Sequence, residues 1–174
     1  MRVAPLTPAD VDSYRALMLE AYASAPDAFT STPEERAAEP ESWWLKRIAD
    51  SSGSTVAFGA YDGGELVGTV ALEFAFKPKT RHKALLIGMY VKPGARGTGA
   101  GRSLVAAAIE HAKAKPGVQV ITLTVTQGNV AAEALYRSVG FKSFGVEPMA
   151  IRGQEGYLSK VHMWLALGNA ETAA

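Results

Sequence analysis

The 174-residue sequence contains no cysteine. This absence excludes disulfide bonds, thiolate zinc sites and a covalent acyl-cysteine intermediate, and it is compatible with a reducing compartment. The chain also lacks any long apolar run. Residues 1–8 contain no apolar segment of signal-peptide length, and no window approaches the length of a transmembrane helix. We therefore expect a cytoplasmic protein that does not bind membranes.

The sequence also lacks a large excess of positively or negatively charged residues. Lys and Arg together number 18 and Asp and Glu 17, which leaves a formal net charge of +1. This balance does not predict wholesale binding to nucleic acid, although a local basic patch would still suit one polyanionic cofactor. What the chain does have is 48% apolar residues, enough for a packed core. We expect a single domain over residues 1–167 and a flexible tail over residues 168–174.

Hydrophobic periodicity and turn residues predict an α/β fold with a mixed, mainly antiparallel sheet flanked by helices, in the order β-α-α-β-β-β-α-β-α-β-β. Three antiparallel strands precede a glycine-rich loop, and a helix and a parallel strand follow it. The predicted strands cover residues 2–6, 55–61, 65–76, 83–91, 118–126, 141–146 and 157–167. The predicted helices start near residues 7, 32, 101 and 130, and the second of them breaks or restarts at Pro40.

The loop between the central strand and the next helix has the sequence Arg-Gly-Thr-Gly-Ala-Gly at residues 96–101. Its alternate glycines would let the backbone approach a ligand closely, and the helix behind it presents free N–H groups and a positive dipole end. These features predict a site for a phosphate-like anion, with Arg96 and Arg102 at the rim. A dinucleotide fingerprint would need glycine in place of Arg102, and a P-loop would need a lysine that is absent. The alternative is a tight turn without a ligand.

A second motif, Asn-x-x-Ala-x-x-Leu-Tyr-x-x-x-Gly-Phe, occupies residues 129–141. Taken alone it describes a capped helix that packs Tyr136 into a core. Together with Arg-x-x-Gly-x-Gly at residues 96–101 and Val-x-Pro at residues 91–93, it resembles the GNAT N-acetyltransferase superfamily. The resemblance extends over about residues 55–146.

This resemblance implies direct transfer of an acetyl group from acetyl-CoA to a primary amine, on a small molecule, a peptide N-terminus or a lysine, without a metal. It implies that main-chain groups bind the pantetheine arm and the pyrophosphate, that Asn129 touches the pantetheine, and that Tyr136 lies near the thioester sulfur as a proton donor. It also implies that the strands ending near Val91 and Thr124 splay apart to admit the cofactor. The residues implied for acetyl-CoA binding are Met89, Tyr90, Val91, Arg96, Gly97, Thr98, Gly99, Ala100, Gly101, Arg102, Ser103, Asn129 and Tyr136.

The general base is left open by the sequence. An alkylammonium acceptor must lose a proton before it attacks, because its pKa is near ~10.4. Glu73 is our catalytic candidate for this step, since a carboxylate in an apolar strand is costly unless it is used or paired. Pairing with a cation is the alternative for Glu73. His82, at the start of the next strand, and a water chain are the other candidates.

For the residues that could bind the acceptor, the sequence leaves two alternative roles open. Trp43 and Trp44 would either wall the acceptor pocket or pack in a helix core, and Arg81 and Arg152 would either bind an acidic acceptor or remain solvated. Related acetyltransferases carry acidic residues just after a tyrosine, and Ser159 and Lys160 stand there after Tyr157, so the acceptor preference of those relatives does not transfer. A homodimer through the last strands would be compatible with the sequence. The functional alternative is a non-catalytic acyl-CoA-binding sensor or interaction module.

Overall fold

One seven-stranded sheet runs through the chain in the order β1-β2-β3-β4-β5-β7-β6. The computed structural model describes residues 1–168, and the predicted tail beyond Gly168 lies outside the described residues. All neighbouring strands are antiparallel except β4 and β5, which are parallel. This arrangement confirms the predicted mixed, mainly antiparallel sheet. The strands are β1 (Arg2–Pro5), β2 (Thr55–Asp62), β3 (Glu65–Phe74), β4 (Lys83–Val91), β5 (Val120–Thr126), β6 (Lys142–Gly153) and β7 (Gly156–Ala166).

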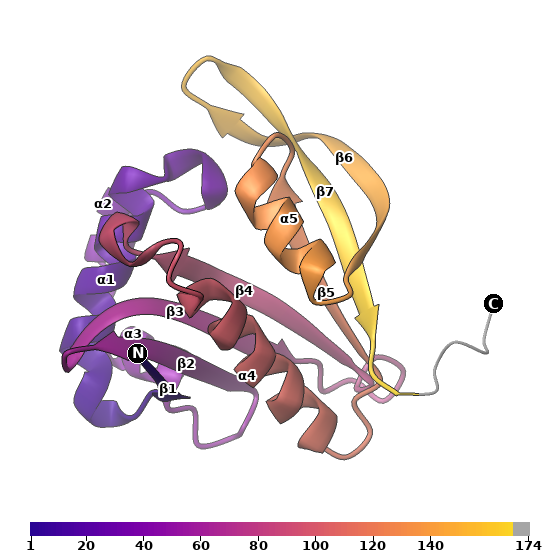
Figure 1. Cartoon of the computed structure of the whole chain (residues 1–174), viewed down its shortest axis with the longest axis horizontal. Helices are drawn as coiled ribbons and strands as arrows, with labels where there is room; N and C mark the ends of the chain where they lie inside the picture. The colour runs from indigo at the N-terminus through magenta and orange to yellow at the C-terminus, as the bar shows by residue number, and fades with distance from the viewer. Residues whose placement is uncertain (169–174) are drawn as a thin grey trace.

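Helices cover both faces of this sheet. The α-helices are α1 (Val11–Ser24), α2 (Pro33–Ala37), α3 (Glu41–Ile48), α4 (Ala100–Ala114) and α5 (Val130–Ser138). Helices α4 and α5 lie on one face, and α1 and α3 lie on the other (Figure 1). The predicted second helix forms as two, because Pro40 interrupts it and becomes the N-cap of α3. None of the helices within residues 1–168 is long and apolar enough to cross a membrane.

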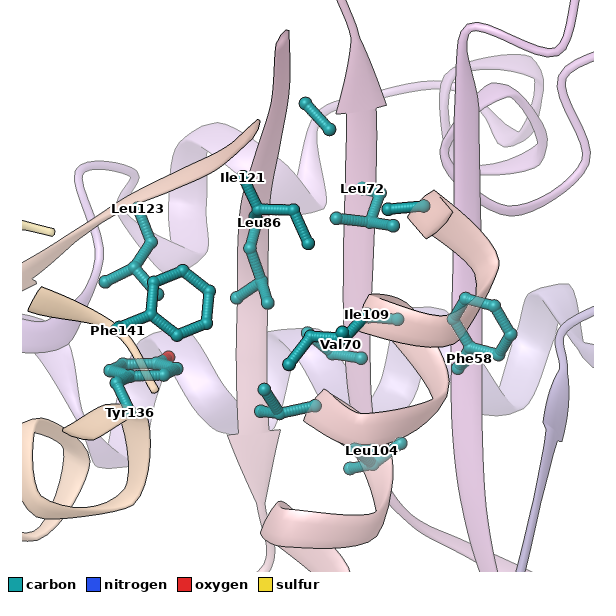
Figure 2. Packing of buried hydrophobic residues seen from close by; sticks show 14 of the residues in the cluster. Phe58, Val70, Leu72, Leu86, Leu104, Ile109, Ile121, Leu123, Tyr136 and Phe141 are labelled. Carbon is teal, nitrogen blue, oxygen red and sulfur yellow. The ribbon is translucent and has the colours of Figure 1, made fainter. Parts of the chain in front are cut away.

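Each face of the sheet carries its own hydrophobic core, because successive side chains of a strand point to opposite faces. On one face, Val70 and Leu72 of β3 pack with Leu104 and Ile109 of α4 (Figure 2). On the other face, Ala71 of β3 belongs to the core formed with α1 and α3. The strands β2, β3 and β4 are therefore buried between helices on both faces, whereas most residues of β6 are exposed.

The paired tryptophans lie in the second of these cores. Trp44 is 0% exposed, and its ring packs edge-on against Tyr14 at 6.0 Å and against Trp43 at 5.0 Å between ring centroids. Neither tryptophan lines the groove or the cavity described below. Of the two alternatives for these residues, the structure supports packing in a helix core.

Several strand boundaries differ from the predictions, and two of the differences have an identifiable physical cause. Strand β3 ends before Phe76, whose side chain is 83% exposed, because residues 77–80 already form a turn. Strand β6 continues to Gly153 instead of stopping at residue 146. A bulge between β6 and β7 absorbs Pro148 and Met149, and Met149 has a φ of 53°. The proline therefore bends the strand without ending it.

Strands β4 and β5 pair over a short stretch and then diverge. Their parallel register ends at the pair Leu85 and Thr122, although β4 continues to Val91 and β5 to Thr126. Strand β5 keeps its pairing with β7 as far as Lys160. The expected splay is therefore confirmed, and it opens the middle of the sheet next to α5.

Candidate functional site

The glycine-rich loop joins β4 to α4 through a backbone that glycine adopts more easily than other residues. Gly97 and Gly99 have φ values of +77° and +88°, a left-handed conformation without steric cost for glycine. Gly99 is the N-cap of α4, so the chain turns directly into the helix. A Cβ atom on either glycine would meet no atom within 4 Å. The loop is thus bordered by open space that a ligand can enter.

Beyond Arg96, whose N–H donates to Pro93 O at 3.2 Å, the main-chain amides of this loop have no acceptor among the described residues. Among the residues that the structure describes, the N–H groups of residues 97–102 donate to no acceptor, and Ser103 N is the first to do so, to Gly99 O at 3.0 Å. Unpartnered N–H groups at a helix N-terminus, together with the positive end of the helix dipole, bind anions. The loop therefore has the donors that a diphosphate requires.

Side chains of the loop fix its shape. Arg96 Nε donates to Val91 O at 3.0 Å, and Thr98 Oγ1 donates at 2.7 Å to a carbonyl oxygen of the preceding turn. Arg102 Nη1 donates to Ser138 Oγ of α5 at 3.3 Å. Both arginines line the groove described below, and the hydroxyl of Thr98 is used within the turn.

A groove of about 510 Å³ extends from this loop along β4 and α5 to Tyr136. Thr98 and Ser103 were expected there and do not line it, because Thr98 bonds back into the turn and Ser103 already belongs to α4. The other residues implied for acetyl-CoA binding all line the groove: Met89, Tyr90, Val91, Arg96, Gly97, Gly99, Ala100, Gly101, Arg102, Asn129 and Tyr136.

Tyr90 has a side chain with a structural role. It is 5% exposed and belongs to the core on the α1 face of the sheet. Its hydroxyl donates to Glu20 Oε1 at 3.0 Å and lies 3.0 Å from Ser24 Oγ, and both partners are on α1. The tyrosine ring therefore ties α1 to β4 next to the groove.

A smaller cavity of about 190 Å³ lies where β4 and β5 diverge, and it meets the groove at Tyr136. Tyr136 is 5% exposed, and its ring packs against Phe141 beside Leu123 (Figure 2). Burial raises the pKa of Tyr136 well above its ordinary value of 10.0. The hydroxyl is therefore protonated at neutral pH, and within residues 1–168 it makes no hydrogen bond. It is free to donate to a group bound in the cavity.

Asn129 lines both the groove and the cavity, and it also caps α5. Its Oδ1 accepts a hydrogen bond from Ala132 N at 3.2 Å. In the described part of the chain its Nδ2 has no acceptor, so the side chain can stabilise the helix and donate to a ligand at the same time.

We expect an Asn129→Ser variant to separate these two roles. Serine caps helices about as well as asparagine, so the free energy of unfolding should change by less than about 0.5 kcal/mol. The amide donor is lost, and the Kd for acetyl-CoA should rise about 3- to 10-fold, as for one hydrogen bond. Urea denaturation and calorimetry measure the two quantities. An unchanged Kd would show that Asn129 acts as a cap alone.

The candidate bases lie outside both cavities. Glu73 Oε1 is 3.0 Å from Arg47 Nη1 of α3, on the face of the sheet opposite α4. His82 is exposed and precedes β4. Neither residue lines the groove or the cavity, so the structure does not bring either of them together with Tyr136. The ion pair matches the paired-charge alternative for Glu73, and its catalytic role stays a prediction.

Two parts of the cavity wall were not expected as site residues. One is the turn η2 (Pro26–Ala28) with the residues after it, which is held against β5 because Thr126 Oγ1 donates to Asp27 O at 2.6 Å. The other is Lys160 of β7, which lies opposite Thr126 in the β5–β7 register. Both placements depend on contacts between segments that are far apart in the sequence, and no local sequence motif indicates them.

A metal site is not apparent at this position. Across residues 1–168, no group of three or more His, Cys, Asp or Glu side chains is arranged to hold a metal ion. The polar atoms that surround the groove are main-chain amides, hydroxyls and amides of side chains, and the two arginines at the rim.

Comparison with known proteins identifies relatives across most of the chain. The family model described as "Acetyltransferase (GNAT) family" matches residues 16–141. The mycothiol acetyltransferase of Beutenbergia cavernae is 30% identical over 151 residues, which are 86% of this chain and 46% of that protein. The mycothiol acetyltransferase of Salinispora tropica is 29% identical over 133 residues, 76% of this chain and 41% of that protein. The chain therefore spans less than half the length of these two curated relatives.

Solved structures agree with the fold over almost the whole chain. A ribosomal-protein-alanine N-acetyltransferase from Brucella melitensis is 27% identical with a TM-score of 0.78, and the match covers 96% of this chain and 100% of that one. A GNAT superfamily phosphinothricin acetyltransferase from Sinorhizobium meliloti, solved in complex with AcCoA, has a TM-score of 0.84. It is 20% identical over 99% of this chain and 91% of that one, which is a likeness of fold.

Proposed function

The chain belongs to the acetyltransferase (GNAT) family, and we propose that it transfers the acetyl group of acetyl-CoA directly to the primary amine of an acceptor. The acceptor is a small molecule, a peptide N-terminus or a lysine side chain. The matched family model supports the reaction class. The relatives are named for different acceptors, so the acceptor class has to be argued from the cavity of this chain.

The observation that carries this proposal is the continuity between the unpartnered amides and Tyr136. The groove begins at the N–H groups of residues 97–102 and ends at the cavity that Tyr136 lines. The amides suit a pyrophosphate, and the edge of β4 and Asn129 suit the amides of a pantetheine arm. The open space beside Gly97 and Gly99 supports the fit, because side chains there would block the approach of a diphosphate.

The transfer reaction requires that the acceptor nitrogen lose a proton and that the leaving sulfur gain one. Bound acetyl-CoA supplies an activated acyl group. The acceptor nitrogen forms a bond to the acyl carbon as the carbon–sulfur bond breaks, and the nitrogen gives one proton to water. Tyr136 would donate its proton to the leaving sulfur, whose thiol resembles that of cysteine with a pKa of about 8.5, and would recover a proton from solvent. Holding the amine and the thioester together would supply a further part of the rate.

An assay of coenzyme A release over a panel of primary amines tests this proposal. We expect saturable acetyl-CoA binding and acetylation of at least one class of amine at a rate that depends on the enzyme. The alternative is a non-catalytic sensor, which would bind acetyl-CoA and acetylate none of them. Inhibition by ATP in place of coenzyme A would contradict the acyl-CoA assignment itself.

A further inference from the structure

The small cavity next to Tyr136 has a single charged side chain in its wall. Within residues 1–168 that side chain is Lys160, which is half-buried on β7 between β5 and β6. The other polar side chains of the wall are neutral: Thr30, Thr124, Thr126, Asn129 and Tyr136. An acceptor that enters the cavity therefore meets one cation and no anion.

The ammonium of Lys160 makes no ion pair and no hydrogen bond in the described part of the chain. No acceptor lies within hydrogen-bond distance of its ammonium, and no carboxylate lies within ion-pair distance. Glu147, its register partner on β6, instead places Oε2 2.8 Å from His162 Nε2. Burial lowers the pKa of Lys160, and Glu147 opposes this shift. A half-buried cation without an ion pair is unfavourable, and an anion that binds beside it would reduce that cost.

A second unpartnered cation lies further along the same side. A neighbouring cavity of about 540 Å³ shares Phe29 and Thr30 with the first one, and Arg152 of β6 lines it. Within residues 1–168, Arg152 makes no ion pair or side-chain hydrogen bond. Asp27 contributes the carboxylate in the wall of this second cavity. The walls of the two cavities together therefore carry two cationic side chains, Lys160 and Arg152, and one carboxylate, that of Asp27.

We propose that Lys160 determines acceptor specificity by binding an acidic group, a carboxylate or a phosphate, that the acceptor carries close to its primary amine. This proposal rests on the acetyltransferase function proposed above. An acceptor with an ammonium group alone would be repelled by Lys160. An acidic group offsets the repulsion, and the nearby cation favours the neutral form of the amine, which is the form that attacks.

The experiment measures kcat/KM on paired acceptors that differ in the acidic group. The pairs are the amino acids with their carboxamides, and phosphoethanolamine with ethanolamine. We expect the wild type to prefer the acidic member of at least one pair about 10-fold or more, as for a hydrogen bond to a charged group. Carboxylates and phosphates are distinguished by which pair shows the preference.

Variants test the part that Lys160 plays. Lys160→Met should abolish the preference, mainly through KM, and Lys160→Arg should retain most of it because the charge is kept. Lys79→Met removes a lysine from the exposed turn between β3 and β4 and should leave the preference unchanged. Calorimetry with acetyl-CoA confirms that each variant is folded.

Three results would overturn the proposal. Equal activity of the wild type on both members of every pair would exclude an acidic acceptor while leaving the acetyltransferase function in place. A Lys160→Arg variant with a lowered kcat on all acceptors and an unchanged KM would identify a proton acceptor instead of an anion site. Failure to acetylate any amine would overturn both this inference and the proposed function.

Discussion

Replacing Tyr136 by phenylalanine is expected to lower kcat by about 100- to 10,000-fold, the usual range for the loss of a general acid. The hydroxyl is buried, its pKa is raised by burial, and no described residue takes its hydrogen bond. The ring itself packs against Phe141, and phenylalanine preserves that contact. We therefore expect the Kd for acetyl-CoA to change less than about threefold. Steady-state kinetics and calorimetry give the two values.

The matched control is Tyr157→Phe, because Tyr157 is 59% exposed and lines neither cavity. Its turnover should equal that of the wild type. A Tyr136→Phe variant with unchanged kcat would remove Tyr136 from the acid role. Glu73→Gln belongs in the same series. A small change would fit its ion pair with Arg47, and a loss as large as that of Tyr136→Phe would show that Glu73 is the base.

Replacing Gly99 by valine is expected to weaken acetyl-CoA binding about 100-fold or more. Gly99 has a φ of +88°, and a β-branched residue in that conformation is strained by about 1–3 kcal/mol. The loop would relax to a different backbone, and the N–H groups of residues 97–102 would no longer converge on one anion. Loss of two charge-assisted hydrogen bonds is enough for this effect. Calorimetry with acetyl-CoA measures it.

Gly94→Val is the control for this substitution. Gly94 lies in the short turn η3 (Pro93–Ala95), has no positive φ, and a Cβ atom there would meet no other atom within 4 Å. It does not line the groove. We expect its affinity for acetyl-CoA to stay within about threefold of the wild type. If Gly99→Val also kept wild-type affinity, the loop amides could not be the main anchor of the cofactor.

Much of the fold was predictable because its local signals are strong. The turn residues and alternating strands around the loop at residues 96–101 indicated the strand directions, and the two motifs placed Tyr136 and Asn129 on the correct helix. Two of the three alternating glycines of the loop, Gly97 and Gly99, border open space, as their spacing indicated. Each of these features is decided by residues close together in the chain.

Features that depend on long-range pairing were not accessible in the same way. Lys160 lines the cavity because β7 lies between β5 and β6, in a register that brings it opposite Thr126. Glu73 was a candidate for catalysis because nothing in the strand itself reveals that Arg47 of α3 lies beside it. The extension of β6 past Pro148 likewise depends on the bulge that its partner strand accommodates.

The central claim is that main-chain amides between Gly97 and Arg102 hold the diphosphate of acetyl-CoA and so direct its thioester to Tyr136. Calorimetric titration of the wild type with acetyl-CoA and with S-acetylpantetheine, which lacks the diphosphate, tests this most directly. We predict saturable heat with acetyl-CoA, displacement by coenzyme A, and binding of S-acetylpantetheine at least about 100-fold weaker. Equal affinity for both compounds, or no heat with either, would contradict the claim.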